Sequence, residues 1–526
     1  MSLGEKIYKL RTEHKLSQEK FGELFSVTPQ SVQKWENDKS LPDLDKLIKI
    51  ANQFNLSLDE FILDKDQRKN EIENYNKPIA PNFSKISQDE SYDSSLLTEY
   101  KQSTEEGLDI EKYRDLFKVI GTLPKDENRK RLGDIAFDIV KNAKTVEGYK
   151  YNEPSTLDEI KSLRSNFKYS AEKITKEKLR NKIHGAVLGR ICGCYLGKSV
   201  ECIISKHLVP MLKEMDNYPM NRYILKSEIP EKYFNIFPHL NIVNAYPDVV
   251  DYMPTDDDTN YIVLAQKLIN DYGKDFTSEN AASNWVESQS RRAYCTAELV
   301  AYKNILNNFE PPQTAIYRNP FREWIGAQIR GDYFGYINPG NPEKAAEMAF
   351  RDASISHIKN GIYGEMYISA MLAIAAVNSD IKEIILGGLA QIPKTSRLYE
   401  NIMEVLNDYE NGKTFKEVMS KVHERYPEET RHGLVHTISN AMIVTAVLLY
   451  GNLDYSKSIC MAVEVGYDTD CNGATVGSVV GMIKGVEAID EKWSKPLNNT
   501  LETRVFGMPK IKITDLAENT LKHIDL

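Results

Sequence analysis

Helical spacing of apolar residues is the feature that most constrains the fold of this chain. Long segments of its second half place apolar side chains three and four residues apart and end at Gly, Pro or Asn; examples are "NYIVLAQKLINDYG", "GEMYISAMLAIAAV" and "GLVHTISNAMIVTAVLLYG". This spacing puts the apolar side chains on one face of a helix. Alternating apolar and polar runs, which a half-buried strand needs, are hard to find. We therefore predict an all-α protein.

A polar stretch from about residue 66 to residue 108 divides the chain. It has few large apolar side chains and is rich in Ser, Asn, Glu and Lys. Such a segment buries too little surface to offset the entropy lost on ordering, which predicts a flexible linker. Helical periodicity resumes on both sides of Leu123 and Pro124, and this predicts a helical hairpin that serves either in dimerisation or as a lead-in to the next domain. We expect a five-helix domain over 1–65, a linker with this hairpin over 66–151, and one large all-α domain over 152–526.

Charge and cysteine content exclude several classes of protein. A formal net charge of −9 argues against a chain that coats nucleic acid or anionic membrane over its whole surface, although it leaves a local nucleic-acid site open. The six cysteines form no CxxC pair and no zinc-ligand spacing, so we expect neither a disulfide framework nor a zinc module, and we expect a cytoplasmic location. The N-terminus is charged rather than apolar, and the longest apolar runs fall far short of the ~20 residues of a membrane span. We expect a protein that is neither exported nor membrane-bound.

Two short helical segments joined by a tight turn characterise the first 65 residues. They are "SQEKFGELF" and "TPQSVQKWE", with Ser17 and Thr28 as N-caps and Pro29 at the first helical position. Together with the "LSLDEF" end, this region resembles the phage-repressor type of helix-turn-helix DNA-binding domain. The resemblance implies that the second helix enters the major groove, and that a homodimer binds a palindromic operator through residues 1–65. The predicted DNA-binding residues are Gln18, Thr28, Gln30, Ser31, Gln33, Lys34, Asn37 and Lys39.

A competing interpretation makes the first domain a module that binds a protein partner only. The domain has slightly fewer basic than acidic residues, whereas a strong DNA binder is normally basic.

Two aspartate clusters open helical runs in the large domain. Asp256, Asp257 and Asp258 precede one run, and Asp468 and Asp470 precede another. Acidic residues are common in the first turn of a helix because of its dipole, but neighbouring like charges repel and an N-cap needs one carboxylate. Carboxylate and hydroxyl oxygens are the ligands that Mg²⁺ selects. The pattern predicts a site for one or two Mg²⁺ ions.

Three motifs from about Ser155 to the C-terminus resemble those of the ADP-ribosylglycohydrolase family, which is all-helical and binds two metal ions. They are "GAVLGRICGCYLGKSVE", "DDDT" and "DTDCNGATVGSVVGMIKG". The resemblance implies the metal ligands Glu201, Asp256, Asp257, Asp258, Asp468 and Asp470. Two positions depart from the family pattern. If Thr259 is held in register, Asp256 stands where the family has its first metal-binding threonine, although Thr255, one residue earlier, could serve under a shifted register. Cys471 stands where the family has another threonine, and a thiol is a poor ligand for Mg²⁺.

The resemblance also implies a hydrolytic mechanism. The metal would orient the ribose hydroxyls, and Asp257 or Glu201 would deprotonate the water that attacks the ribose C1 through an oxocarbenium-like state. The glycine- and aromatic-rich stretch "REWIGAQIRGDYFGYINPGNP" is suited to hold a diphosphate and to stack on adenine, although it also suits a turn packed on the core. The predicted substrate-binding residues are Arg330, Gly331, Asp332, Tyr333 and His357, of which the lone histidine has a purely structural alternative.

Two functions follow from these features. The first is a DNA-binding regulator fused to a Mg²⁺-dependent hydrolase that removes ADP-ribose, or a related ribosyl group, from a protein, a nucleic acid or a small molecule. The second is a repressor that senses ADP-ribose or a nucleotide without turnover, which the Asp256 and Cys471 departures favour.

Overall fold

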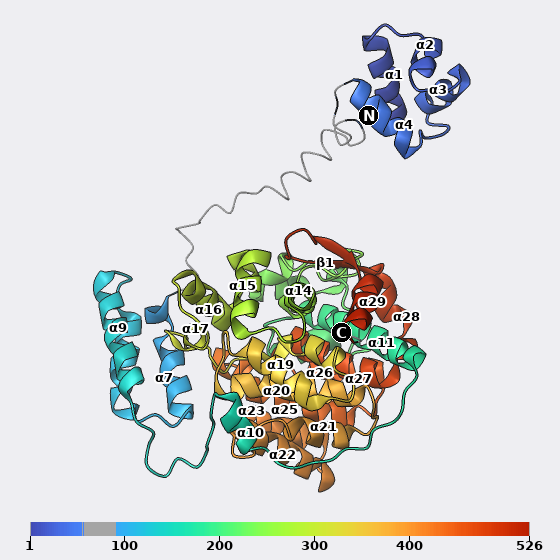
Figure 1. The fold of residues 1–526 in the computed structure, drawn as a ribbon. Coiled ribbons are helices and arrows are strands. Elements are labelled where there is room, and N and C mark those ends of the chain that lie inside the picture. Colours follow the sequence, from blue (N-terminus) through green and yellow to red (C-terminus); the bar gives the residue numbers. More distant parts are fainter. Residues whose placement is uncertain (1, 55, 57–60, 62–90, 525–526) are drawn as a thin grey trace. The chain divides into compact units, whose positions relative to one another are not determined.

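The computed structural model describes residues 2–54, 56, 61 and 91–524 of the chain. The chain divides into two compact units, residues 1–86 and 87–526 (Figure 1). The described residues form helices and two short strands, which confirms the all-α prediction. The part of the expected linker from residue 66 to residue 90 lies outside the described residues, and so does most of the expected fifth helix of the first unit.

Four helices make up the described part of the first unit: α1 (Leu3–Glu13), α2 (Gln18–Leu24), α3 (Pro29–Glu36) and α4 (Leu44–Gln53). The expected caps are present, since the Ser17 side chain accepts a hydrogen bond from the Lys20 amide and the Thr28 side chain accepts one from the Ser31 amide. Gly22 permits the tight turn between α2 and α3, because a Cβ there would lie 2.6 Å from the Val27 carbonyl oxygen. The core of this unit consists of Ile7, Leu10, Phe21, Phe25, Val32, Trp35, Ile50, Ala51 and Phe61.

The second unit begins with α7 (Leu96–Glu105), α8 (Arg114–Thr122) and α9 (Glu127–Asn142). Helices α8 and α9 lie on the two sides of Leu123 and Pro124, like the predicted hairpin, whereas α7 is a helix within the stretch that was predicted to be a flexible linker. The body of the unit follows as α10 (Leu157–Ser162), α11 (Lys176–Lys198), α12 (Ser205–Glu214), α13 (Glu231–Ile236), α14 (Asp257–Tyr272), α15 (Ser278–Ser288), α16 (Thr296–Leu306), α17 (Gln313–Ile316), α18 (Asp332–Tyr336), α19 (Pro342–Ala353), α20 (Lys359–Ala375), α21 (Ile381–Leu389), α22 (Arg397–Glu410), α23 (Phe415–Arg425), α24 (Arg431–Val435), α25 (Thr437–Tyr450), α26 (Tyr455–Glu464), α27 (Thr469–Lys484), α28 (Glu491–Ser494), β1 (Thr500–Glu502), β2 (Lys510–Lys512) and α29 (Ile513–Ile524).

Helices α20 and α25 lie at the centre of this unit. From Asn360 to Ala375 and from Thr437 to Leu449, every residue is buried. A helix that is apolar around its whole circumference must be enclosed by other helices, which is what the sequences of these two segments require.

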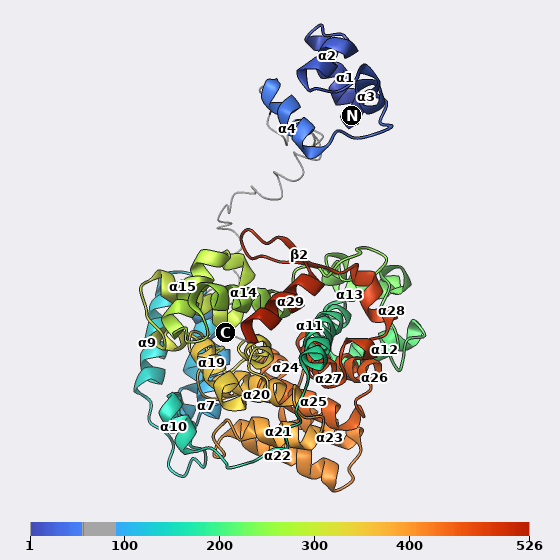
Figure 2. The ribbon, with the colours of Figure 1, turned by 45° about the vertical axis from the view of Figure 1, so that its right-hand side comes forward.

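Helices α11 and α27 pack against each other along a seam of small residues (Figure 2). Four glycines of α11 are spaced four residues apart and face small residues of α27 in reverse order: Gly185 with Gly481, Gly189 with Gly477, Gly193 with Gly473, and Gly197 with Thr469. A Cβ at Gly193 would lie 2.0 Å from the Gly473 carbonyl oxygen, so the two backbones are in direct contact. The antiparallel seam therefore brings the C-terminal end of α11 to the N-terminal end of α27.

A short hairpin fixes the loop that leads into α14. Strands β1 and β2 pair antiparallel, with Leu501 opposite Ile511. Met253 bonds to β1 through both backbone groups, since its amide donates to the Thr500 carbonyl and its carbonyl accepts from the Glu502 amide, each at 2.9 Å. The start of α14 is thereby fixed beside the seam.

No helix among the described residues is long and apolar enough to cross a membrane.

Candidate functional site

The two predicted aspartate clusters meet where α11, α14 and α27 come together. Each of Asp256, Asp257, Asp258 and Asp470 places a carboxylate oxygen within 4.8 Å of those of the other three. Local structure sets this arrangement, because Asp256 is the N-cap of α14 and accepts a hydrogen bond from the Asp258 amide at 2.9 Å. The structure thus joins residues that lie some two hundred positions apart in the sequence.

A cavity of about 540 Å³ opens beside this cluster. Its acidic side includes Glu201, Asp257, Asp468, Asp470 and Cys471. The rest of the lining includes Trp324, Ile325, Gly326, Ile329, Glu428, Glu429, Arg431, Leu434 and Val435. Cavities of roughly 300–1,000 Å³ that combine apolar walls with a few charged groups are typical of small-molecule sites.

Two cations compensate part of the negative charge. The Lys198 ammonium donates to Asp256 Oδ2 at 2.6 Å, and a guanidinium nitrogen of Arg190 lies 2.9 Å from Asp258 Oδ1. Burial would raise the pKa of Asp256, but the adjacent ammonium holds that pKa below its ordinary value. Burial raises the pKa of Asp257 to about 6 and that of Glu201 to about 8, and the neighbouring carboxylates add to both shifts.

The remaining carboxylate oxygens fit a hard divalent cation. Asp258 Oδ2 and Asp470 Oδ1 are buried and have no hydrogen-bond partner within the part of the chain that the structure describes. A buried carboxylate oxygen without a partner is costly, and a cation would satisfy it. Opposite oxygen ligands of such a cation lie about 4–5 Å apart, which matches the span of the cluster.

Cys471 lies at the edge of this cluster. Its sulfur is within 4.8 Å of oxygens of Asp258 and Asp470, and the residue is buried. Burial and the surrounding carboxylates raise the pKa of the thiol well above its ordinary value, so the sulfur stays protonated at neutral pH. Sulfur is a poor ligand for a hard cation such as Mg²⁺, which leaves the cation to the oxygens.

The structure does not bring the predicted substrate-binding residues to this cavity. None of Arg330, Gly331, Asp332, Tyr333 and His357 is among the described residues that line it. Arg330 is 3% exposed and pairs with the buried carboxylates of Glu298 and Asp352.

The other four predicted substrate-binding residues also make contacts inside the core. Asp332 pairs with Arg190 at 2.8 Å, and the Tyr333 hydroxyl bonds to His523 Nδ1 at 2.7 Å. A Cβ at Gly331 would lie 2.7 Å from the Ser369 hydroxyl oxygen, and His357 is fully buried. The expected stretch does reach the cavity, but through its first residues, from Trp324 to Ile329.

Lys198, Cys194 and Arg431 are site residues that the sequence interpretation missed. Cys194 places its sulfur within 4.8 Å of oxygens of Asp256 and Asp258. The sequence did carry a signal, because Cys194, Lys198 and Glu201 follow one another at intervals of four and three, which places them on one side of a helix and its extension.

A second polar cluster lies behind the cavity wall and connects it to α7. The Trp324 Nε1–H donates to His432 Nδ1 at 3.2 Å, and His432 Nε2 lies 2.9 Å from Glu105 Oε2, at the end of α7. The Ile438 amide donates to His436 Nδ1 at 3.1 Å. Both Nδ1 atoms are acceptors, so both Nε2 atoms carry the proton and are not free to bind a metal. Glu105, His432 and His436 therefore form a polar cluster rather than a metal centre; His432 bonds to Glu105, and His436 Nε2 has no hydrogen-bond partner among the described residues.

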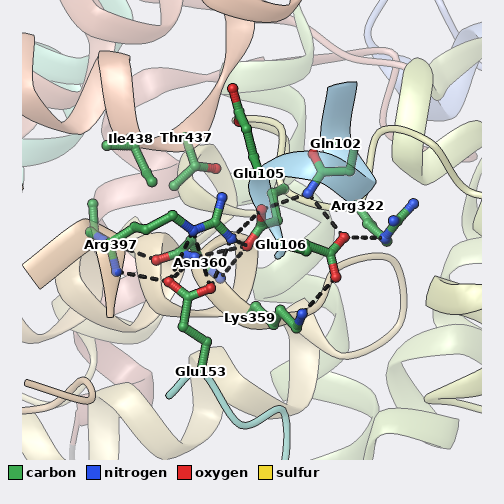
Figure 3. Close-up of polar contacts among 12 residues, drawn as sticks. Gln102, Glu105, Glu106, Glu153, Arg322, Lys359, Asn360, Arg397, Thr437 and Ile438 are labelled. Carbon is green, nitrogen blue, oxygen red and sulfur yellow. Dashed lines mark hydrogen bonds and ion pairs between the residues drawn. The ribbon is translucent and has the colours of Figure 1, made fainter. Parts of the chain in front are cut away.

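Buried ion pairs hold α7 in the unit (Figure 3). Glu106, just after α7, accepts hydrogen bonds from Arg322 Nε and Lys359 Nζ, both at 2.7 Å. Arg322 also pairs with Glu99 at 2.8 Å, and Gln102 donates to Glu323. Because these groups are nearly inaccessible, removing either partner of a pair leaves an uncompensated buried charge.

The predicted DNA-binding residues gather on and around α3. Those whose side chains are exposed are Thr28, Gln30, Gln33, Lys34, Asn37 and Lys39. Ser31 is half-buried and its hydroxyl lies 3.0 Å from that of Thr28. Gln18 donates to Glu36 at 2.6 Å, and Glu36 also pairs with Arg11. This bond fixes α2 against α3.

Comparisons with known proteins match both units. A family model described as ADP-ribosylglycohydrolase matches residues 175–525, and one described as helix-turn-helix matches residues 7–61. The HTH-type transcriptional regulator ImmR of Bacillus subtilis (strain 168) is 33% identical over 81 residues, which are 15% of this chain and 63% of ImmR. A solved chain titled "ADP-ribosylglycohydrolase-related protein complex" shares 15% identity at a TM-score of 0.41, over 66% of this chain and 99% of that chain.

Proposed function

The chain belongs to the ADP-ribosylglycohydrolase family, and we propose from this premise that its large domain hydrolyses the bond between ADP-ribose, or a related ribosyl group, and a protein, a nucleic acid or a small molecule. The observation that carries the proposal is the convergence of Asp256, Asp257, Asp258 and Asp470 beside a cavity that Glu201 and Asp468 also line. Mg²⁺ is the cation we propose for the cluster.

The oxygens of Asp258 and Asp470 would hold the cation, with Asp256 and Asp257 beside them. When bound, it would supply positive charge to orient ribose hydroxyls and to favour ionisation of a water. Asp257, with a pKa of about 6, is ionised at neutral pH and is suited to accept the proton of the attacking water. Glu201, with a pKa of about 8, carries a proton at neutral pH and is suited to donate it to the leaving group.

Another part of the cavity lining would bind the rest of the substrate. Arg431 lines the cavity, lies over the Trp324 ring at 5.3 Å from its centroid, and offers a guanidinium for the diphosphate. We propose Arg431 in place of Arg330.

The test measures the release of free ADP-ribose, in the presence of Mg²⁺, from arginine-, serine- and nucleic-acid-linked substrates. We expect release by the wild type and at least a hundredfold less by Asp470→Asn, because one of the two unpartnered oxygens loses its charge. Asp490→Asn, an exposed residue before α28, is the matched control and should retain full activity. Tight ADP-ribose binding without release from any of these substrates would refute the hydrolase proposal.

We propose that the first unit binds an operator through α3. Gln30 and Lys34 are exposed on that helix, and amide and cationic side chains match base edges and phosphates in the major groove. The double variant Gln30→Ala, Lys34→Ala should weaken operator binding by about tenfold or more, as the loss of one good base contact already costs about 1–3 kcal/mol. Lys9→Ala, an exposed change on α1, is the control. Equal operator affinity of the double variant and the wild type would contradict this role, and it would favour the protein-binding interpretation.

A ligand-sensing repressor is the second candidate function. The observation that favours it is the hydrogen-bonded chain from Trp324 in the cavity wall through His432 to Glu105 on α7, the first α-helix of the second unit. A ligand that moves Trp324 would disturb this chain. Under this function, ADP-ribose changes operator affinity in the wild type and leaves it unchanged in Glu105→Gln, although the variant still binds ADP-ribose. Unchanged operator affinity in the wild type on saturation with ADP-ribose would rule this function out.

A further inference from the structure

Lys198 occupies the acidic cluster as a built-in cation. It is the last residue of α11, and its Nζ lies 2.6 Å from Asp256 Oδ2 and 4.0 Å from Glu201 Oε2. Its side chain is only 18% exposed, so the ammonium is largely removed from solvent. A largely buried ammonium persists only where carboxylates compensate for its desolvation.

The glycine seam fixes the helix that carries this lysine. A Cβ at Gly197, the residue before Lys198, would lie 2.2 Å from the Thr469 carbonyl oxygen. Thr469 immediately precedes Asp470. The last turn of α11 and the start of α27 therefore have a set separation, which holds the Lys198 backbone beside the cluster.

Two buried oxygens of the cluster remain free to bind a cation. Asp256 Oδ2 accepts from Lys198, and Asp258 Oδ1 accepts from Arg190. The buried cluster oxygens that lack any hydrogen-bond partner among the described residues are Asp258 Oδ2 and Asp470 Oδ1. Both oxygens belong to the same cluster, so together they can bind one ion.

We propose that this domain binds a single divalent cation, between Asp258 and Asp470, and that the Lys198 ammonium supplies the positive charge of a second ion at Asp256. The inference rests on the proposed metal-dependent function but concerns the number of ions. Lys198 is a positioning residue, since it fixes the Asp256 carboxylate and adds charge beside the cavity.

The test is Mn²⁺ binding to the full chain, with stoichiometry from native mass spectrometry and affinity from the electron paramagnetic resonance signal of free Mn²⁺. We expect one Mn²⁺ per wild-type chain. Lys198→Met frees Asp256, and we expect either a second Mn²⁺ or an affinity at least tenfold higher for the first. Lys198→Arg keeps the charge and should remain at one ion. Lys206→Met, an exposed change on α12, is the matched control and should behave as the wild type.

Two ions in the wild type would overturn the inference, whatever the variants do. So would one ion of equal affinity in the wild type and in Lys198→Met, or no ion in the wild type. Lys198→Gln, which keeps a hydrogen-bond donor near Asp256 without the charge, replaces Lys198→Met if that variant does not fold. One bound ion without any ADP-ribose release would refute the hydrolase proposal and leave this inference standing, so the two failures are distinguishable.

Discussion

Replacing Gly193 by alanine tests whether direct backbone contact between α11 and α27 holds the domain together. The new Cβ would lie 2.0 Å from the Gly473 carbonyl oxygen, whereas ordinary contacts begin at 3.4 Å, so the helices must separate by more than 1 Å. Opening a packed contact by 0.5–1 Å loses roughly a quarter to a half of its dispersion energy. Overpacking lowers the free energy of unfolding by about 1–3 kcal/mol, and by more where the backbone must move. The better helix propensity of alanine raises it by up to about 1 kcal/mol. We expect a net loss of about 2–3 kcal/mol in the free energy of unfolding.

Urea denaturation followed by circular dichroism measures this loss, and Mn²⁺ affinity measures its effect on the site. Metal binding should weaken as well, because the seam sets the distance between Lys198 and Asp470. Gly121→Ala on α8 is the matched control, since a Cβ there meets nothing within 4 Å. It should leave stability unchanged or raise it by about 0.5–1 kcal/mol. A Gly193→Ala variant as stable as the wild type would show that the two helices do not make this close approach.

Two further predictions concern buried charges. Arg330→Met should destabilise the large domain by about 3–5 kcal/mol, because it leaves the carboxylates of Glu298 and Asp352 unpaired. Thermal unfolding measures this loss. Normal stability together with weaker ADP-ribose binding would instead show that Arg330 binds the substrate. Burial lowers the pKa of Lys182 from an ordinary value of 10.5 to about 8. Between about pH 8 and pH 10.5, the folded state therefore binds fewer protons than the unfolded state. The stability that this group contributes rises with pH over that range. The stability of Lys182→Met relative to the wild type should therefore fall from pH 8 to pH 10; a difference that does not change with pH would contradict the shift.

The helical fold and the acidic cluster could be predicted because their signals are local. Apolar spacing identifies helices without knowledge of their neighbours, and Asp256, Asp257 and Asp258 stand out because adjacent like charges need an explanation. The four-residue spacing of the α11 glycines is equally visible in the sequence. Their partners on α27 are not, because a close approach depends on a helix almost three hundred residues away.

The surroundings of the predicted substrate-binding residues could not be inferred from the sequence, because an arginine among glycines and aromatics suits two environments. Such an arginine can face a ligand, or it can pair with buried carboxylates, and only the fold shows that Glu298 and Asp352 surround Arg330. Lys198 could have been suspected from its spacing to Glu201. Its partner could not, because Asp256 lies 58 positions further along the chain.

The most direct test of the account is a crystal structure of the full chain with Mn²⁺ and ADP-ribose, with the metal located by its anomalous scattering. We expect an anomalous peak between Asp258 and Asp470, with the ribose in the cavity beside Asp257 and Glu201. ADP-ribose bound elsewhere, or an acidic cluster without an anomalous peak at saturating Mn²⁺, would contradict it.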